Sequence, residues 1–106
     1  GNLTAIVDLN GQQALGYTED VLSLTPLAAR WRAFGWDVHE VDGHDPAGMA
    51  AVIAGLEPAR GPHVLVARTT FGKGVSFMER QIRWHYLPMS EDEYRQARAE
   101  VCGTDA

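Results

Sequence analysis

Three short runs rich in Val, Ile and Leu alternate with two stretches patterned as amphipathic helices, and this alternation constrains the fold most. The apolar runs lie at residues 3–9, 36–41 and 63–68. The stretches between them begin at Thr25 and Asp45, each of which is followed by a proline, a pairing typical of a helix start. Because this order of elements requires crossover connections, the sequence predicts an α/β fold with a parallel sheet and flanking helices.

Each predicted helix has an apolar stripe that is expected to face the sheet. In the first helix, the stripe consists of Leu27, Trp31 and Phe34, which are spaced at i, i+4 and i+7. We expect the rings of Trp31 and Phe34 in the core, and we expect Gly35 to end the helix. The second has its stripe at Met49, Val52, Ile53 and Leu56.

The last part of the chain predicts a glycine-rich turn and then a third helix. The turn, Gly72-Lys73-Gly74, follows the third apolar run. The helix is expected to begin at Ser90, because Glu93 stands where it would complete a capping box.

Length, charge and cysteine usage exclude several classes of protein. A chain of 106 residues makes one domain or less, and its net charge of −5 argues against a general nucleic-acid or membrane-surface binder. Cys102 is the only cysteine, so no intrachain disulfide can form, which favours a reducing compartment. No signal peptide or apolar run of membrane-spanning length occurs. We therefore expect a cytoplasmic protein with no nucleic-acid or membrane partner.

The first predicted strand, which contains Ile6, is expected to be buried on both faces, and Asn10 stands where this strand runs into an Asn-Gly turn. In open α/β sheets, ligands bind just beyond the carboxyl ends of strands. The amide oxygen of Asn10 and nearby carbonyl groups are hard oxygen donors that suit Mg²⁺ or Ca²⁺. A purely structural turn is the alternative. An Asn-Gly hairpin is disfavoured, because residues 12–16 make a poor second strand.

Three loops, at residues 10–17, 42–45 and 69–76, are expected to meet at one edge of the sheet, because parallel strands place their carboxyl ends together. The third loop does not have P-loop spacing, but it could place backbone N–H groups near a phosphate. His44, in the second loop, is interpreted as a structural histidine and not as a catalytic one.

Five ordered blocks of sequence carry a resemblance to a known family. Together they resemble the thiamine-diphosphate-dependent transketolase family, and most of all the amino-terminal subunit of two-chain bacterial transketolases, over nearly the whole chain. The blocks are Ala5-Ile-Val-Asp-Leu-Asn-Gly-Gln-Gln, Leu27-Ala-Ala-Arg-Trp-Arg-Ala-Phe-Gly-Trp-Asp-Val, Val41-Asp-Gly-His-Asp, Thr69-Thr-Phe-Gly-Lys-Gly-Val-Ser-Phe-Met-Glu and Trp84-His85.

The resemblance implies thiamine diphosphate and Mg²⁺ as cofactors and assigns residues to them. Asn10 matches the second half of the family's cofactor motif, so its side chain would bind Mg²⁺, with the backbone carbonyl of Gln12 as a neighbouring ligand. Thr70 and Phe71 would border the thiazolium ring. Lys73 would help to balance the diphosphate charge; a solvated loop lysine is the alternative.

By the same resemblance, His85 would be catalytic as well as cofactor-binding. The family's histidine at this motif lies by the cofactor's phosphate and the reacting carbon and assists proton movements. Tyr86 follows it here, where the family usually has a glycine, which puts in doubt the close approach of the backbone to a ligand. The alternative is a surface histidine packed against Trp84.

The family's Gly-Asp-Gly motif is absent from this sequence. We therefore expect residues 1–106 to be the later half of a thiamine-diphosphate-binding domain. This half would be inactive alone and would belong to a split, hetero-oligomeric transferase. A companion chain or segment would supply the Gly-Asp-Gly half, and a pyrimidine-binding transketolase subunit would complete the site.

The reaction implied is transfer of a two-carbon ketol unit between sugar phosphates or related ketoses and aldoses. Two alternatives remain. One is another thiamine-diphosphate enzyme, of the deoxyxylulose-phosphate synthase type. The other is a non-catalytic scaffold or interaction fragment of the same fold.

Overall fold

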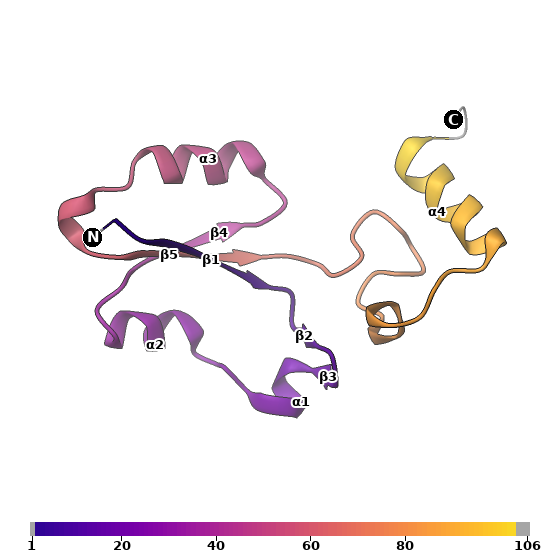
Figure 1. The fold of residues 1–106 in the computed structure, drawn as a ribbon, viewed down its shortest axis with the longest axis horizontal. Helices are drawn as coiled ribbons and strands as arrows, with labels where there is room; N and C mark the ends of the chain where they lie inside the picture. The colour runs from indigo at the N-terminus through magenta and orange to yellow at the C-terminus, as the bar shows by residue number, and fades with distance from the viewer. Residues whose placement is uncertain (1, 104–106) are drawn as a thin grey trace. The chain divides into compact units, whose positions relative to one another are not determined.

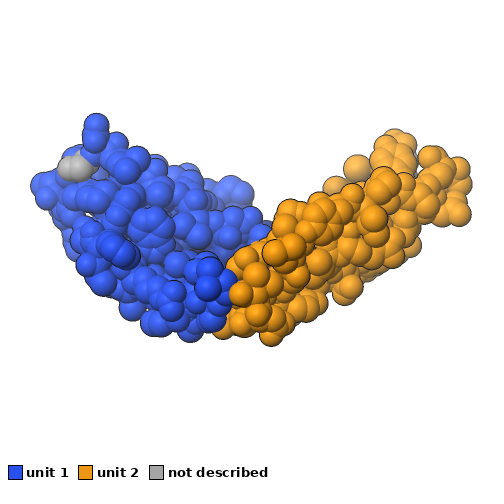
Figure 2. All heavy atoms as spheres, turned by 60° about the horizontal axis from the view of Figure 1, so that its bottom comes forward, with its two compact units in different colours: residues 1–10, 22–69 blue, residues 11–21, 70–106 orange. Residues whose placement is uncertain are grey.

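The structure, a computed structural model, describes residues 2–103 and divides into two compact units (Figure 2). The described part of unit 1 comprises residues 2–10 and 22–69, and that of unit 2 comprises residues 11–21 and 70–103. Each unit is therefore assembled from two separate segments of the chain.

Unit 1 contains a three-stranded parallel sheet (Figure 1). Its strands are β1 (Thr4–Leu9), β4 (Asp37–Asp42) and β5 (His63–Arg68), in the spatial order β1-β5-β4. Helices α2 (Leu27–Ala33) and α3 (Pro46–Ala54) lie on opposite sides of the sheet, and the short 3₁₀ helix η1 (Pro58–Arg60) precedes β5. The predicted parallel α/β fold is confirmed.

The core of unit 1 is centred on β5, which pairs with a strand on each side. Its residues Val64, Leu65, Val66 and Ala67 are all at most 3% exposed, as expected for a central strand of a parallel sheet. The first strand is not buried on both faces as predicted. Burial alternates along β1, and Ile6 is 55% exposed, because within residues 2–103 this strand lies at an edge of the sheet.

Of the two predicted helix starts, the one at Asp45 is confirmed and the one at Thr25 is wrong by one residue. Asp45 caps α3 as expected: its side chain accepts a hydrogen bond of 3.0 Å from the backbone N–H of Gly48. Thr25 is not the cap of α2, because the helix begins one residue later, with Pro26 in the capping position. The carbonyl of Thr25 instead accepts a 3.0 Å hydrogen bond from the Arg30 guanidinium.

The aromatic residues of α2 are less buried than predicted. Trp31 is half-buried and packs edge-on against Trp36, with ring centroids 4.8 Å apart. Phe34 is 84% exposed, and placing it in the core was wrong. It follows the last helical residue as the C-cap, so the i+7 spacing no longer holds its side chain on the sheet-facing side.

The described part of unit 2 consists of a small hairpin, a long loop and three helical segments. The hairpin pairs β2 (Gln12–Gln13) with β3 (Gly16–Tyr17), and α1 (Thr18–Leu22) follows. The prediction that Asn-Gly does not form a hairpin turn is confirmed: residues 14 and 15 form the turn of this hairpin, and Asn10-Gly11 leads into its first strand.

The second segment of unit 2 contains the 3₁₀ helix η2 (Ile82–His85) and α4 (Glu91–Cys102). The capping box predicted at Ser90 and Glu93 is present, and Gly103 is the C-cap of α4. Within residues 2–103, every helix is too short or too polar to cross a membrane.

Candidate functional site

The carboxyl ends of the three strands of unit 1 meet at one edge, as predicted. The backbone N–H of Thr69 donates to the carbonyl of Leu9 at 3.3 Å, and its hydroxyl donates to the Asp8 carboxylate. From the other side, Gly43 N–H donates to the carbonyl of Arg68 at 2.9 Å. Asn10 follows β1 directly and is half-buried, so it stands at the edge where α/β proteins bind ligands.

The Asp-Gly-His-Asp turn after β4 has a structural explanation. A Cβ on Gly43 would lie 2.4 Å from the Thr69 methyl carbon, so only glycine fits this close approach. The Asp42 carboxylate accepts a hydrogen bond from His44 N–H at 2.8 Å, and Asp45 then caps α3. The turn therefore shapes the edge through main-chain bonds and the side chains of Asp42 and Asp45. His44 is exposed, and the structural role of its imidazole stays a prediction.

In unit 2, the predicted residues Phe71 and His85 are in contact. Their rings are stacked, with centroids 6.1 Å apart and planes 2° from parallel. The Phe71 carbonyl accepts a 2.9 Å hydrogen bond from Arg80 N–H, and this bond closes the loop between Phe71 and Arg80. Gly72 makes this closure possible: its φ is +71°, and a Cβ there would lie 2.6 Å from the Met78 carbonyl oxygen.

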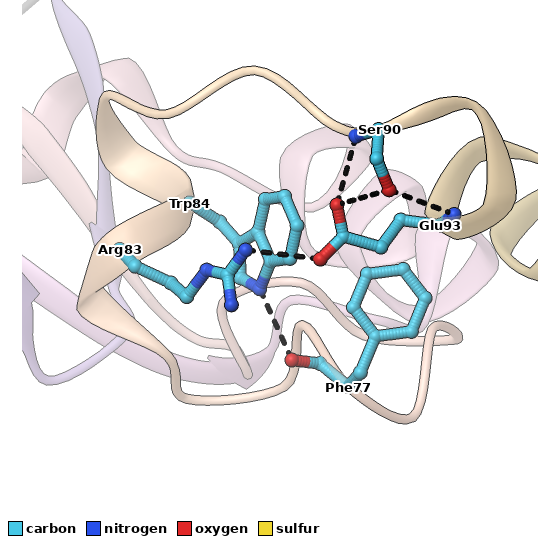
Figure 3. Close-up of polar contacts among 5 residues, drawn as sticks. All are labelled: Phe77, Arg83, Trp84, Ser90 and Glu93. Carbon is cyan, nitrogen blue, oxygen red and sulfur yellow. Dashed lines mark hydrogen bonds and ion pairs between the residues drawn. The ribbon is translucent and has the colours of Figure 1, made fainter.

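The 3₁₀ helix η2, which carries His85, is held in place by contacts of the two residues that precede His85 (Figure 3). Trp84 donates from its indole Nε1 to the carbonyl of Phe77 at 3.0 Å, and their rings pack edge-on. The Arg83 guanidinium lies 4.3 Å from the centre of the Trp84 ring and pairs with the Glu93 carboxylate at 2.9 Å. With Trp84 engaged in this way, the rings in contact with exposed His85 are those of Phe71 and Tyr86.

Two tyrosines attach the hairpin to the His85 region within unit 2. Tyr86 donates its hydroxyl to the Ala14 carbonyl, and Tyr17 donates to the Arg80 carbonyl at 3.3 Å. Tyr86 has a φ of −130°, so its backbone conformation does not require the glycine usual in the family. Sequence patterns do not predict these bonds, because both acceptors are main-chain carbonyls.

Two glutamates of α4 have a lowered pKa. For Glu93 the main cause is the hydrogen bond from the Ser90 backbone N–H, and the Ser90 hydroxyl and Arg83 add to it. For Glu100 the main cause is the backbone N–H of Ser76, with Gln96 and the Ser76 hydroxyl adding to it. These carboxylates attach α4 to the η2 region and to the glycine-rich loop.

The glycine-rich loop offers a side-chain cation more readily than backbone N–H groups. The N–H of Lys73 donates to the carbonyl of Thr70 at 3.2 Å, and that of Gly74 donates to the Glu79 carboxylate, also at 3.2 Å. Both donors are therefore occupied inside the loop. The Lys73 side chain is exposed and its charge suits a diphosphate, and Thr70 is half-buried beside Phe71.

The predicted residues are divided between the two units. Asn10 belongs to unit 1, and Gln12, Thr70, Phe71, Lys73 and His85 belong to unit 2. Taken one by one, these residues offer groups of the kind that a magnesium-bound diphosphate cofactor uses: neutral oxygens at Asn10 and Gln12, an ammonium at Lys73, and a flat apolar surface at Phe71.

Comparison with known proteins gives one family and several relatives. Residues 1–105 match the family described as "Transketolase, thiamine diphosphate binding domain". The chain is 41% identical over 101 residues to one subunit of a protein named apulose-4-phosphate transketolase, from Phocaeicola vulgatus, covering 94% of this chain and 36% of that subunit. It is 36% identical over 101 residues to 6-deoxy-6-sulfo-D-fructose transketolase subunit SqwG, from a Clostridium species, covering 94% of this chain and 37% of the relative.

A solved structure shares the fold. Transketolase from Campylobacter jejuni superposes with a TM-score of 0.83 at 23% identity, over 95% of this chain and 16% of that one. The chain thus spans about a third of the length of the subunit relatives described above.

Proposed function

Because this chain belongs to the family of transketolase thiamine-diphosphate-binding domains, we propose that it is part of an enzyme that transfers a two-carbon ketol unit. The substrates would be sugar phosphates or related ketoses and aldoses. The match over residues 1–105 is the observation that carries this proposal. Relatives named as transketolase subunits that act on sugar derivatives support it.

The active enzyme contains further polypeptide besides residues 1–106. Residues 1–106 act as the later half of the cofactor domain, and a companion chain or segment supplies the Gly-Asp-Gly half. A pyrimidine-binding transketolase subunit completes the site, and the span alone is inactive. Subunit naming among the relatives, and a match to about a third of their length, support this arrangement.

Exposed surface on unit 1 also supports assembly. Both β1 and β4 are edge strands within residues 2–103, and unpaired strand edges favour pairing with further strands. Leu3, Ile6 and Phe34 are all more than half exposed. We expect obligate association, so a stable monomer across micromolar concentrations in light scattering would contradict this part of the proposal.

The cofactor would be thiamine diphosphate with Mg²⁺. Asn10 would bind the metal through its side-chain oxygen, with the carbonyl of Gln12 as a neighbouring ligand, because Mg²⁺ favours oxygen ligands shared with phosphate groups. Lys73 would balance the diphosphate charge, and Thr70 and Phe71 would border the thiazolium ring. When bound, thiamine diphosphate supplies the electron sink for breaking a carbon–carbon bond.

His85 would move a proton at the substrate's reacting oxygen. An imidazole titrates near neutral pH, so it can both donate and accept a proton under physiological conditions. Its stacking on Phe71 fixes the plane of the ring, and η2 is held by the contacts of Arg83 and Trp84. An exposed but oriented imidazole suits a group that must meet a substrate.

The decisive experiment measures steady-state ketol transfer by the assembled enzyme with thiamine diphosphate and Mg²⁺. We expect His85→Ala to lower kcat about 100- to 10,000-fold, the usual contribution of a positioned acid or base. Its thermal melting should stay close to that of the unmodified protein. His44→Ala is the matched control, because it changes an exposed histidine of unit 1 and should leave kcat unchanged. Normal turnover by His85→Ala would remove this residue from the mechanism.

Asn10→Ala tests the metal ligand in the same assay. Loss of one oxygen ligand should raise the Mg²⁺ and cofactor concentrations needed for half-maximal activity by roughly 10- to 100-fold, since even changes next to metal ligands have effects of that order. The fold should be intact by circular dichroism. Unchanged cofactor affinity would show that Asn10 is a structural turn residue.

A further inference from the structure

Three side chains with metal-binding atoms meet at the amino-terminal ends of β4 and β5. His39 Nε2 lies 3.4 Å from His63 Nδ1 and 3.7 Å from Asp37 Oδ2, and His63 Nδ1 lies 3.5 Å from the same carboxylate oxygen. All three residues belong to unit 1. No residue of the proposed cofactor site is among them, so they need an explanation of their own.

The sheet itself brings these residues together. Asp37 and His39 are two positions apart on β4, so they lie on the same face of the strand. His63 opens β5 and is the register partner of Asp37. The cluster therefore stands at the opposite end of the strands from Asn10, Gly43 and Thr69. Strands of six residues separate the two ends by roughly 16 Å.

The orientation of His63 is that of a metal-binding imidazole. Its Nε2 lies 2.9 Å from the carbonyl oxygen of Glu57, and a carbonyl can only accept, so this nitrogen carries the proton. In the neutral ring, Nδ1 then presents a lone pair toward His39 and Asp37. A backbone carbonyl that fixes the tautomer in this way is the usual outer partner of a histidine that binds a metal.

The spacing of the three atoms fits a tetrahedral metal ion. Bonds of about 2.0 to 2.1 Å to zinc place neighbouring ligands about 3.3 to 3.4 Å apart. The observed separations of 3.4, 3.5 and 3.7 Å form a nearly equilateral triangle of that size. His63 is nearly buried, with 4% of its side chain exposed, whereas 20% of Asp37 and 29% of His39 are exposed. The open side leaves room for a fourth ligand such as water.

Arg60 is the group that competes with a metal here. Its Nε lies 3.0 Å from the Asp37 carboxylate, but 62% of its side chain is exposed. An exposed arginine can move into solvent at little energetic cost, because ion pairs made by exposed side chains contribute little to stability. Without a metal, the cluster is a hydrogen-bonded group in which Arg60 balances the charge of Asp37.

We propose that Asp37, His39 and His63 bind a transition-metal dication of the zinc type. Two imidazoles and one carboxylate suit Zn²⁺, Co²⁺ or Ni²⁺ and not Mg²⁺, which prefers oxygen ligands. The ion joins β4 to β5 at the end of the sheet away from the cofactor edge. Its binding therefore stabilises the sheet and takes no part in ketol transfer.

The test is a Co²⁺ titration of the tag-free protein in its native assembly, after treatment with a chelator and with Mg²⁺ in excess. Bound Co²⁺ should give the intense visible absorption of a four- or five-coordinate site, with one ion per chain, and Zn²⁺ should displace it. Zn²⁺ should also raise the melting temperature, because a ligand that binds only the folded state stabilises it.

Variants of the cluster assign the site. His39→Ala should weaken Co²⁺ binding by at least about 100-fold, since even outer-partner changes weaken metal affinity 10- to 100-fold. Arg60→Ala should tighten binding by about two- to fivefold, because it removes one exposed competing charge pair. His44→Ala, an exposed histidine outside the cluster, should bind like the unmodified protein.

The outcomes separate a metal site from a hydrogen-bonded cluster. Absence of Co²⁺ absorption at millimolar metal overturns the proposal, as does binding that His39→Ala and Asp37→Asn leave unchanged. Melting of each variant in chelator shows whether it folds. If His39→Ala fails to fold, Asp37→Asn and Arg60→Ala decide the question, because they must change affinity in opposite directions.

Discussion

The interactions that stabilise unit 1 internally differ in kind from those that stabilise unit 2. Unit 1 is built on consecutive aliphatic residues of β5, from Val64 to Ala67, all nearly inaccessible to solvent. In unit 2 the buried hydrophobic side chains among the described residues are Val75 and Ala97, and many of its contacts are directional bonds to main-chain atoms. The sheet therefore depends on apolar burial, whereas the region around His85 depends on the geometry of polar and aromatic contacts.

This difference suits the roles proposed for the two units. Burial of aliphatic groups is favourable without being directional, so it stabilises a scaffold. An exposed side chain such as His85 cannot be positioned by burial. Hydrogen bonds and ring contacts, such as those of Trp84 and Phe71, fix its orientation while its surface stays available. Regions with few buried apolar contacts also open locally at lower free energy.

The largest expected effect is on the core of the sheet. Leu65 is fully buried, and Leu65→Ala should lower the free energy of unfolding by about 2 to 5 kcal/mol through lost burial and the cavity left behind. Leu15→Ala in unit 2 is the matched control: Leu15 is 84% exposed, so its effect should stay within about 0.5 kcal/mol. Urea denaturation measures both. Equal midpoints for the two variants would contradict a core centred on β5.

Removing one helix cap from each unit gives a smaller and more local effect. Asp45→Ala in α3 and Ser90→Ala in α4 each remove a side-chain acceptor from a helix start, which typically reduces stability by about 0.5 to 2 kcal/mol. We expect Ser90→Ala to speed hydrogen exchange in α4 while β5 keeps its protection. If exchange in β5 rises equally, the two units do not differ in the way described.

The smallest effect is the response of α4 to acid. The pKa values of Glu93 and Glu100 are lowered in the folded protein, so each carboxylate stabilises it fully above the ordinary glutamate pKa of about 4.3. This stabilisation is lost as the pH falls from that value through the lowered folded-state pKa. Hydrogen exchange in α4 should therefore quicken with acid over this interval.

The control for the acid response is the double variant Glu93→Gln and Glu100→Gln. It removes both titrating groups, so the exchange rates of α4, corrected for intrinsic chemistry, should depend much less on pH. Protection of α4 that stays constant down to pH values well below the ordinary glutamate pKa would argue against these two carboxylates as the cause.

Local sequence signals predicted much of the fold because they act over a few residues. Asp45 with its following proline, and Ser90 with Glu93, formed the expected caps. The predictions for Ile6 and Phe34 failed because burial depends on which strands and helices pack alongside, which a single element does not encode. Which of three apolar runs becomes the central strand is likewise decided by tertiary pairing.

Site residues were predictable only as candidates. The family resemblance singled out Phe71 and His85, and the structure places their rings in contact. The roles of the candidates in binding and catalysis stay predictions. The tyrosine bonds to Ala14 and Arg80, and the grouping of His63 with residues of β4, depend on contacts between distant segments, so no local pattern points to them.

The strand order of unit 1 has a consequence for how the chain is made. Thr4 and Asp37 both pair with His63, so neither β1 nor β4 has its partner until β5 has been synthesised. At translation rates of about 5 to 20 residues per second, β1 waits roughly 3 to 12 seconds after its own synthesis. During that time its apolar side chains are open to misplaced pairing, and this early strand is the part of the nascent sheet most in need of a chaperone or of a strand from elsewhere.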